Sequence, residues 1–365
     1  MKLSISDMSD LARGAAFLGC GGGGDPYLGQ LLCEHAISTY GMPDVVKLDE
    51  LADDANVYAL AMHGAPTVII EKLFSVEDFD IALAQLEKFT ERKVDAVISG
   101  EAGGFNGLLP IAIAARRGVP VVDADGVGRA VPEAHMSTFN AHGVSISPIS
   151  MANEYGETVI IQSRSAIAGE HIARAVTVEM GLFTAMALYP MTGAQAKSAS
   201  VPDVLTNSLR IGRAIREGRL SGHPIRSLFD TLRSMPEHAY CEMLFDGKIV
   251  DVERETTLEG FTFARYQLAP ISGDGETVTM AVQNENLIAR KGERILGMVP
   301  DLLVLVDGET IEPITTETIR HGQRVKLIGV SVGPMLRSPE ALRWFGPDAF
   351  GIDSRYVPIE VLMNA

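Results

Sequence analysis

The chain has 365 residues, 46% hydrophobic and 21% charged, which is enough for about two globular domains. Its 47 acidic residues outnumber 31 Lys and Arg, and this formal net charge of −16 excludes nucleic acid as an expected partner because such a surface repels phosphate. No apolar stretch reaches the roughly 18 residues of a membrane span, so we expect no membrane partner and a cytoplasmic location. The spacing of Cys20, Cys33 and Cys241 fits no zinc ribbon and indicates reduced thiols.

The first half of the chain alternates between helix-like and strand-like segments. Apolar residues at helical spacing predict helices over 6–17, 27–40, 76–90 and 108–117. Short apolar runs predict strands over 45–48, 56–62, 94–99, 119–123, 144–149 and 157–161. This alternation predicts an α/β domain with a mostly parallel sheet.

The spacing of apolar residues along the chain changes near residue 236. Before that point the pattern predicts helices over 171–187 and 201–217. After it, short alternating runs broken by Asp-Gly and Gly-Asp-Gly turns predict a small antiparallel β domain, barrel or sandwich. The strands are expected over 240–245, 248–255, 262–268, 277–281, 302–306 and 324–330. We therefore divide the chain into 1–236, 237–336 and a tail, 337–365, that can return to the first domain.

Gly-rich polar segments follow three of the predicted strands, at 63–67, 100–106 and 123–135. Ligands of parallel α/β sheets sit outside the carboxyl ends of the strands. We therefore expect these three loops to converge on one crevice.

A run of four glycines, Gly21, Gly22, Gly23 and Gly24, lies between the first two predicted helices. Consecutive glycines let backbone N–H groups surround an anion or a carbonyl oxygen, which predicts a substrate-binding loop together with the flanking Cys20 and Asp25. The run lacks the Lys-Ser/Thr of a phosphate-binding loop, and a tight joint between helices is the alternative. Cys20 is either a nucleophile near a helix N-terminus or a buried small side chain.

Glu101 follows the predicted strand 94–99 and leads into Gly103 and Gly104. A carboxylate at a strand end suits a general base or a ligand for substrate N–H groups. Asn106 can orient a substrate carbonyl, or it can cap the helix that follows. His63 ends another strand and is a candidate substrate contact.

Asp123 and Asp125 stand two residues apart at the end of a predicted strand and therefore project to the same side. They can hold a divalent metal or a cationic group, with Glu133 or His135 completing the set. The alternative is a turn in which Arg129 neutralises the acids. A further polar cluster, 283–286, can reach a ligand across a domain interface or simply form a turn.

Six motifs occur in order along the chain: LARGAAFLGCGGGGDPYLG (11–29), MHGAPTV (62–68), EAGGFNGLLP (101–110), VVDADGVGRAVPE (121–133), QNENLIA (283–289) and FGIDSRYVPIE (350–360). Together they resemble the bacterial S-methyl thiohydantoin desulfurase-like family, long known as a domain of unknown function, over nearly the whole chain. The resemblance implies an N-terminal three-layer α/β domain and a smaller C-terminal β-barrel-like domain.

The resemblance also implies hydrolysis of a small cyclic amide, an S-methyl thiohydantoin, to a hydantoin with release of methanethiol. In this reaction Glu101 or Asp125 is the expected base, and the Gly21–Gly24 amides and Asn106 are the expected donors. Arg129 and Glu133 are expected to contact substrate, and a metal held by Asp123, Asp125 and His135 is the alternative activator of water. The family often accompanies hydantoinase or oxoprolinase-type proteins, so the other hypothesis is a non-catalytic accessory subunit. We also expect self-association.

Overall fold

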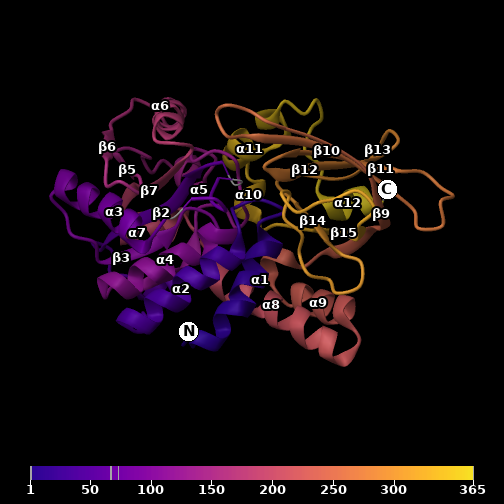
Figure 1. Cartoon of the computed structure of the whole chain (residues 1–365), viewed down its shortest axis with the longest axis horizontal. Helices are drawn as coiled ribbons and strands as arrows, with labels where there is room; N and C mark the ends of the chain where they lie inside the picture. The colour runs from indigo at the N-terminus through magenta and orange to yellow at the C-terminus, as the bar shows by residue number, and fades with distance from the viewer. Residues whose placement is uncertain (1, 66–67, 73, 365) are drawn as a thin grey trace.

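The computed structural model describes residues 2–65, 68–72 and 74–364 (Figure 1). It contains two β-sheets, which we call sheet A and sheet B. The N-terminal half builds sheet A at the left of Figure 1, and the orange and yellow C-terminal strands build sheet B at the right. Residues 66 and 67 of the predicted loop 63–67 lie outside the described residues. No described helix has the length and apolar character needed to cross a lipid bilayer.

Sheet A has mixed strand directions, in the order β1-β4-β3-β2-β7-β5-β6 with β8 beside β4. The four strands from β1 to β2 run parallel, as predicted, whereas β7, β5, β6 and β8 pair antiparallel. The prediction of a mostly parallel sheet is therefore wrong for half of it. The strands are β1 (Val45–Val46), β2 (Asn56–Gly64), β3 (Ala96–Ser99), β4 (Val121–Asp125), β5 (Ile149–Ala152), β6 (Thr158–Ile161), β7 (Phe183–Thr192) and β8 (Val201–Pro202).

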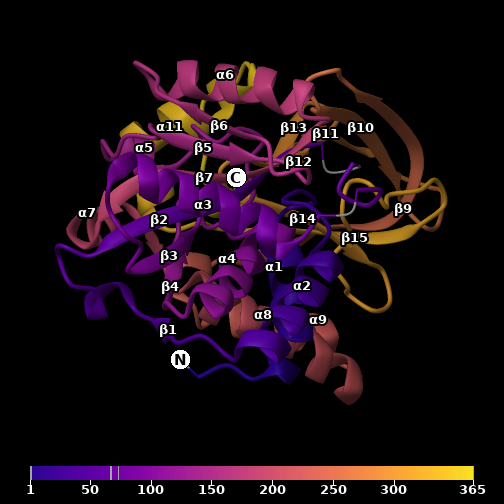
Figure 2. The same ribbon diagram turned by 60° about the vertical axis from the view of Figure 1, so that its left-hand side comes forward.

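Helices cover both faces of sheet A, which makes three layers. One face packs on α3, α4 and α8, with α1 and α2 behind them, and the other face packs on α6 and α7, with α5 beside α7. Figure 2 shows α6 on the opposite side of the sheet from α1, α2 and α4. The helices of this part of the chain are α1 (Met8–Leu18), α2 (Pro26–Tyr40), α3 (Val76–Thr90), α4 (Gly104–Arg117), α5 (Thr138–Ala141), α6 (Ala166–Glu179), α7 (Gly193–Ala199), α8 (Val204–Ser221) and α9 (Pro224–Arg233), and α9 packs on α8 and β9.

The segment 171–187, predicted as one helix, splits into the end of α6 and the start of β7. The helix stops because Gly181 and Leu182 adopt positive φ values of 86° and 65°. The following strand lies between β2 and β5, and all but two of its residues are buried. Its Ala, Met and Leu residues favour helix locally, so burial in the sheet overrides that preference. The predicted strand 144–149 is also wrong, because β5 begins only at Ile149.

Sheet B is fully antiparallel, as predicted, in the order β13-β12-β11-β10-β9-β15-β14. It curls like half a barrel, so that β14 approaches β12 and β13 from the other edge (Figure 2). Asp246 and Gly247 are not the predicted turn, since they lie inside the long strand β9 near a register shift. The strands are β9 (Cys241–Thr256), β10 (Thr262–Ala269), β11 (Val278–Gln283), β12 (Glu285–Lys291), β13 (Arg294–Met298), β14 (Leu302–Asp307) and β15 (Arg324–Val330).

The C-terminal segment joins the two halves. Of its helices, α10 (Pro334–Arg337), α11 (Pro339–Phe345) and α12 (Ile359–Asn364), α11 contacts α5 and α12 contacts β13. Asp301 ties this segment down, because its buried carboxylate accepts hydrogen bonds from Arg337, from the Tyr356 hydroxyl and from the backbone N–H of Ile359. The tail therefore touches both halves of the molecule.

Candidate functional site

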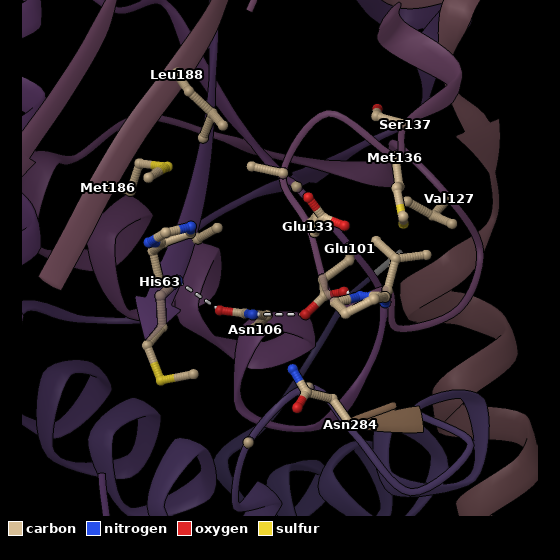
Figure 3. A pocket seen from close by; sticks show the side chains of 18 of the residues that line it. His63, Glu101, Asn106, Val127, Glu133, Met136, Ser137, Met186, Leu188 and Asn284 are labelled. Carbon is tan, nitrogen blue, oxygen red and sulfur yellow. Dashed lines mark hydrogen bonds between the residues drawn. The ribbon is translucent and has the colours of Figure 1, made fainter. Parts of the chain in front are cut away.

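A partly open cavity lies where the two halves meet, and the space between its walls, together with the solvent at its mouth, is about 650 Å³ (Figure 3). Its walls come from the ends of β2 and β3, from the loop after β4, from β7 and from the turn between β11 and β12. The three loops predicted to converge do so, because the parallel strands β2, β3 and β4 deliver them to the same edge of sheet A. Sheet B contributes Asn284 and Glu285 to the lining.

Glu101 and Asn106 form the central polar pair of this cavity (Figure 3). The Asn106 amide donates to Oε1 of Glu101 at 2.6 Å, and its Oδ1 accepts from the backbone N–H of Met62 at 2.7 Å. Asn106 sits in the first turn of α4 and does not cap that helix, whose N-cap is Gly103. Pro110 has no N–H to give the Asn106 carbonyl, and the Ser99 hydroxyl donates to that carbonyl at 2.9 Å instead. The hydrogen bonds to Glu101 and Met62 fix the Asn106 side chain at both its nitrogen and its oxygen.

The Glu101 carboxyl is buried but remains able to ionise near neutral pH. Its Oε2 accepts from the backbone N–H of Val131 at 2.7 Å. Burial raises its pKa to about 7, against the opposing effect of the bonds from Asn106 and Val131 and of the Arg129 charge. Each carboxylate oxygen accepts one of these hydrogen bonds and retains the capacity to accept another. A base with such a pKa is well matched to proton transfer at neutral pH.

Glu285 brings a second carboxyl into the cavity from the first residue of β12. It is 2% exposed, and its Oε2 has no hydrogen-bond partner among the described residues. Burial raises its pKa well above the usual range, and the nearby charge of Glu101 raises it further. Gly22 leaves the room for it, because a Cβ on Gly22 would lie 2.0 Å from Oε1.

The glycine run serves mainly as a joint that holds neighbouring segments. The Cys20 and Gly21 carbonyls accept from the backbone N–H groups of Asn286 and Thr316, both at 2.9 Å, which docks sheet B on the run. The carbonyls of Gly23 and Gly24 accept from the N–H groups at the start of α4, and these two glycines also line the cavity.

Four other predicted site residues lie outside the cavity lining: Cys20 and Asp25 beside the glycine run, and Gly103 and Gly104 at the start of α4. Cys20 is fully buried, and burial raises the pKa of its thiol, so the structure gives no support to a nucleophilic thiolate. Asp25 caps α2 by accepting from the Tyr27 N–H, while Gly103 packs against Ala130 and Gly104 begins α4.

His63 lines the cavity but has both ring nitrogens engaged (Figure 3). Its Nδ1 lies 2.7 Å from the Thr177 hydroxyl, and its Nε2 lies 3.1 Å from Oε1 of Glu170. Glu170 also pairs with Arg174 at 2.5 Å. Burial and the Arg174 charge lower the pKa of His63, and although burial opposes it, the pKa of Glu170 is held well below its usual range by His63 and Arg174. His63 therefore shapes the cavity wall through its ring.

Asp123 and Asp125 serve different structural purposes and do not line the cavity. Asp123 accepts from the Leu205 N–H at 2.8 Å at the start of α8 and pairs with Lys47 at 2.7 Å. Asp125 accepts from the N–H groups of Val127 and Gly128, and burial raises its pKa well above the usual range. Asp125 therefore holds the turn after β4, and of the two predicted bases Glu101 lines the cavity whereas Asp125 does not.

Arg129, Glu133 and His135, which were predicted to lie with Asp123 and Asp125 in one site, occupy different places in the structure. Arg129 is buried outside the lining, where its guanidinium donates to the carbonyls of Pro300 and Asp301 and clamps sheet B. Glu133 lines the cavity, whereas His135 lies beside it, 3.6 Å from the Glu133 carboxyl. Within 2–65, 68–72 and 74–364, no three His, Cys, Asp or Glu side chains are grouped so as to hold a metal ion, so Asp123, Asp125 and His135 do not form the predicted set.

The sequence prediction left the cluster 283–286 open between a ligand contact and a turn, and it missed Arg174. The structure brings Asn284 and Glu285 of this four-residue polar cluster to the cavity, and their proximity to Glu101 depends on how sheet B docks. Arg174 lay inside a segment predicted only as helix.

Comparison with known proteins assigns nearly the whole chain to family models. Two family models match it, "S-Me-THD-like, N-terminal domain" over residues 6–163 and "S-Me-THD-like, C-terminal domain" over residues 164–359. The border between them falls after β6, ahead of the change from sheet A to sheet B. A crystal structure of a protein from Chromobacterium violaceum is 26% identical, with a TM-score of 0.79 over 98% of this chain and 99% of that one. No curated protein matches significantly.

Proposed function

The chain belongs to the S-Me-THD-like family, and we propose that it hydrolyses an S-methylated thiohydantoin ring to the hydantoin and methanethiol. The observation that carries the proposal is the pair of buried carboxyls in one cavity, Glu101 from the first half and Glu285 from the second. Their environments set their pKa values apart, about 7 for Glu101 and well above the usual range for Glu285. One carboxyl is thus available as a base while the other is available as an acid.

The first step is addition of water to the ring carbon that bears sulfur and is doubly bonded to a ring nitrogen. Glu101 removes one proton from the water as its oxygen bonds to carbon, and Glu285 donates its proton to the ring nitrogen. The product is a neutral tetrahedral intermediate that carries a hydroxyl and the methylthio group.

The second step is collapse of this intermediate. The hydroxyl returns a proton to Glu285 as the carbonyl forms, the C–S bond breaks, and the sulfur takes the proton held by Glu101. Both carboxyls recover their starting states, and the net reaction consumes one water and releases one methanethiol.

The lining of the cavity supports a substrate that is small, polar on one side and apolar on another. Three methionines, Met62, Met136 and Met186, line it together with Leu188. Thioether and aliphatic side chains form adaptable apolar walls and suit a methylthio substituent. The polar groups gather around Glu101, Asn106 and Glu285, where a ring with N–H and C=O groups finds partners.

The test is release of methanethiol from an S-methyl thiohydantoin by the purified protein, with a thiol reagent as the readout. We expect turnover by the wild type and a loss of about 100-fold or more in kcat/KM for Glu101→Gln, in line with removal of a general base. Glu293→Gln is the matched control, since Glu293 is exposed in the turn between β12 and β13.

Two results would overturn the proposal. Wild-type rates in Glu101→Gln would remove Glu101 from the chemistry. If the folded wild type binds the ring without releasing thiol, a non-catalytic accessory role becomes the better account.

A further inference from the structure

Asn284 is the single residue between β11 and β12, and its conformation is fixed by several constraints. Its φ is 56°, in the left-handed region that Asn tolerates better than most residues. Its backbone N–H donates to the Thr262 carbonyl at 2.8 Å, and its Oδ1 accepts from the Thr262 N–H at 2.8 Å. The start of β10 therefore holds both the backbone and the side chain of Asn284.

The amide nitrogen of the same side chain, Nδ2, is not used in these contacts. Because Oδ1 is bound to Thr262, the orientation of the amide is set, and Figure 3 shows the nitrogen turned towards Glu101 and Asn106. Among the described residues, Nδ2 has no hydrogen-bond partner, although Asn284 is only 5% exposed and lines the cavity. This donor is therefore open to the cavity, where water or a ligand can accept from it.

We propose that Asn284 is a specificity-determining residue whose Nδ2 donates to the ring carbonyl that is not attacked. This inference rests on the proposed function and adds an orientation to it. The donor comes from sheet B next to Glu285, so the carbonyl points to sheet B and the opposite side of the ring faces the Glu101 base. The site then selects planar cyclic amides with a second carbonyl over otherwise similar rings without one.

Recognition by one hydrogen bond gives a sharp test, because the bond can be removed from either partner. Asn284→Asp keeps an oxygen for the Thr262 N–H but replaces the donor by an acceptor. Asn284→Gly keeps the positive φ and removes the donor without adding charge. The substrates are the S-methyl thiohydantoin and 2-methylthio-imidazoline, the same ring without the second carbonyl.

We expect the wild type to favour the thiohydantoin in kcat/KM, and both variants to lose on the order of tenfold or more of that preference. The loss falls on the carbonyl-bearing substrate, and activity on the imidazoline changes much less in Asn284→Gly. A merely structural role for Asn284 would reduce both substrates equally, and that result would overturn the inference.

Binding of the product ring separates this inference from the proposed reaction. Calorimetric titration compares hydantoin with imidazolidin-2-one, which lacks the second carbonyl. If Asn284→Gly weakens hydantoin binding alone, the inference holds even when the wild type releases no thiol. Equal binding of hydantoin by the wild type and both variants would refute it even when turnover is observed.

Discussion

Substitution of Gly22 by alanine tests the role of Glu285, the proposed acid, without changing the Glu285 residue itself. An added Cβ would lie 2.0 Å from Oε1 of Glu285, and an ordinary contact begins at 3.4 Å, so this oxygen must retreat by about 1.4 Å. The added Cβ would also lie 2.6 Å from Cδ and 2.7 Å from Cγ of this buried side chain, so most of the Glu285 side chain must shift, whereas the φ of Gly22 is not positive and adds no backbone strain.

Gly22→Ala is therefore expected to lower activity strongly and to cost about 1–3 kcal/mol of stability through overpacking. A misplacement of about 1 Å can cost on the order of 100-fold in rate, and we expect a loss of that size in kcat/KM for thiol release. The melting temperature should fall by only a few degrees, and the protein should remain folded. Gly41→Ala is the control, because Gly41 has a φ of 97° but no atom within 4 Å of the added Cβ, so it loses some stability and no activity.

Two results would refute this reasoning. Wild-type kcat/KM in Gly22→Ala would show that the position of the Glu285 carboxyl does not matter to the reaction. A collapse of the melting temperature would show that the Glu285 side chain is held rigidly in place.

Three further changes test the electrostatics of the fold by chemical denaturation. Glu170→Gln leaves the buried Arg174 without its ion pair, so we expect a loss of about 3–5 kcal/mol, and a loss below 1 kcal/mol would contradict this. Asp123→Ala should cost on the order of 1–3 kcal/mol, because this buried carboxylate also caps α8, whereas Asp53→Ala at the exposed pair with Lys197 should cost under about 1 kcal/mol. Glu101 has a folded pKa of about 7 against 4.5 normally, so the folded state binds its proton more tightly. Stability should fall as pH rises from about 4.5 to 7, and fall by less in Glu101→Gln.

The position of the Glu101 loop of sheet A could be predicted from the sequence better than the contribution of sheet B to the cavity. Glu101 follows a buried strand, and its neighbours β2 and β4 are parallel to it, so strand order alone places its loop at the ligand-binding edge. Glu285 reaches the same cavity because the Cys20 and Gly21 carbonyls and the Arg129 guanidinium dock sheet B there. Such long-range contacts leave no periodic pattern in the chain.

The two acids at the end of β4, Asp123 and Asp125, show why their spacing leaves a ligand site and a structural turn as alternatives. Two carboxylates at alternate strand positions can meet a ligand, but here each is already consumed by backbone N–H groups, those of α8 for Asp123 and those of the following turn for Asp125. Helix and turn N–H groups compete for the same lone pairs as a metal ion. Only the positions of those partners, which the spacing does not encode, decide between the two uses.

The pH dependence of kcat/KM for thiol release tests the central claim most directly. If ionised Glu101 is the base, log kcat/KM should rise with pH and level off around its pKa of about 7. The same limb should be missing from the residual activity of Glu101→Gln. A wild-type profile that is flat from pH 5 to pH 9, or an unchanged limb in Glu101→Gln, would contradict the assignment.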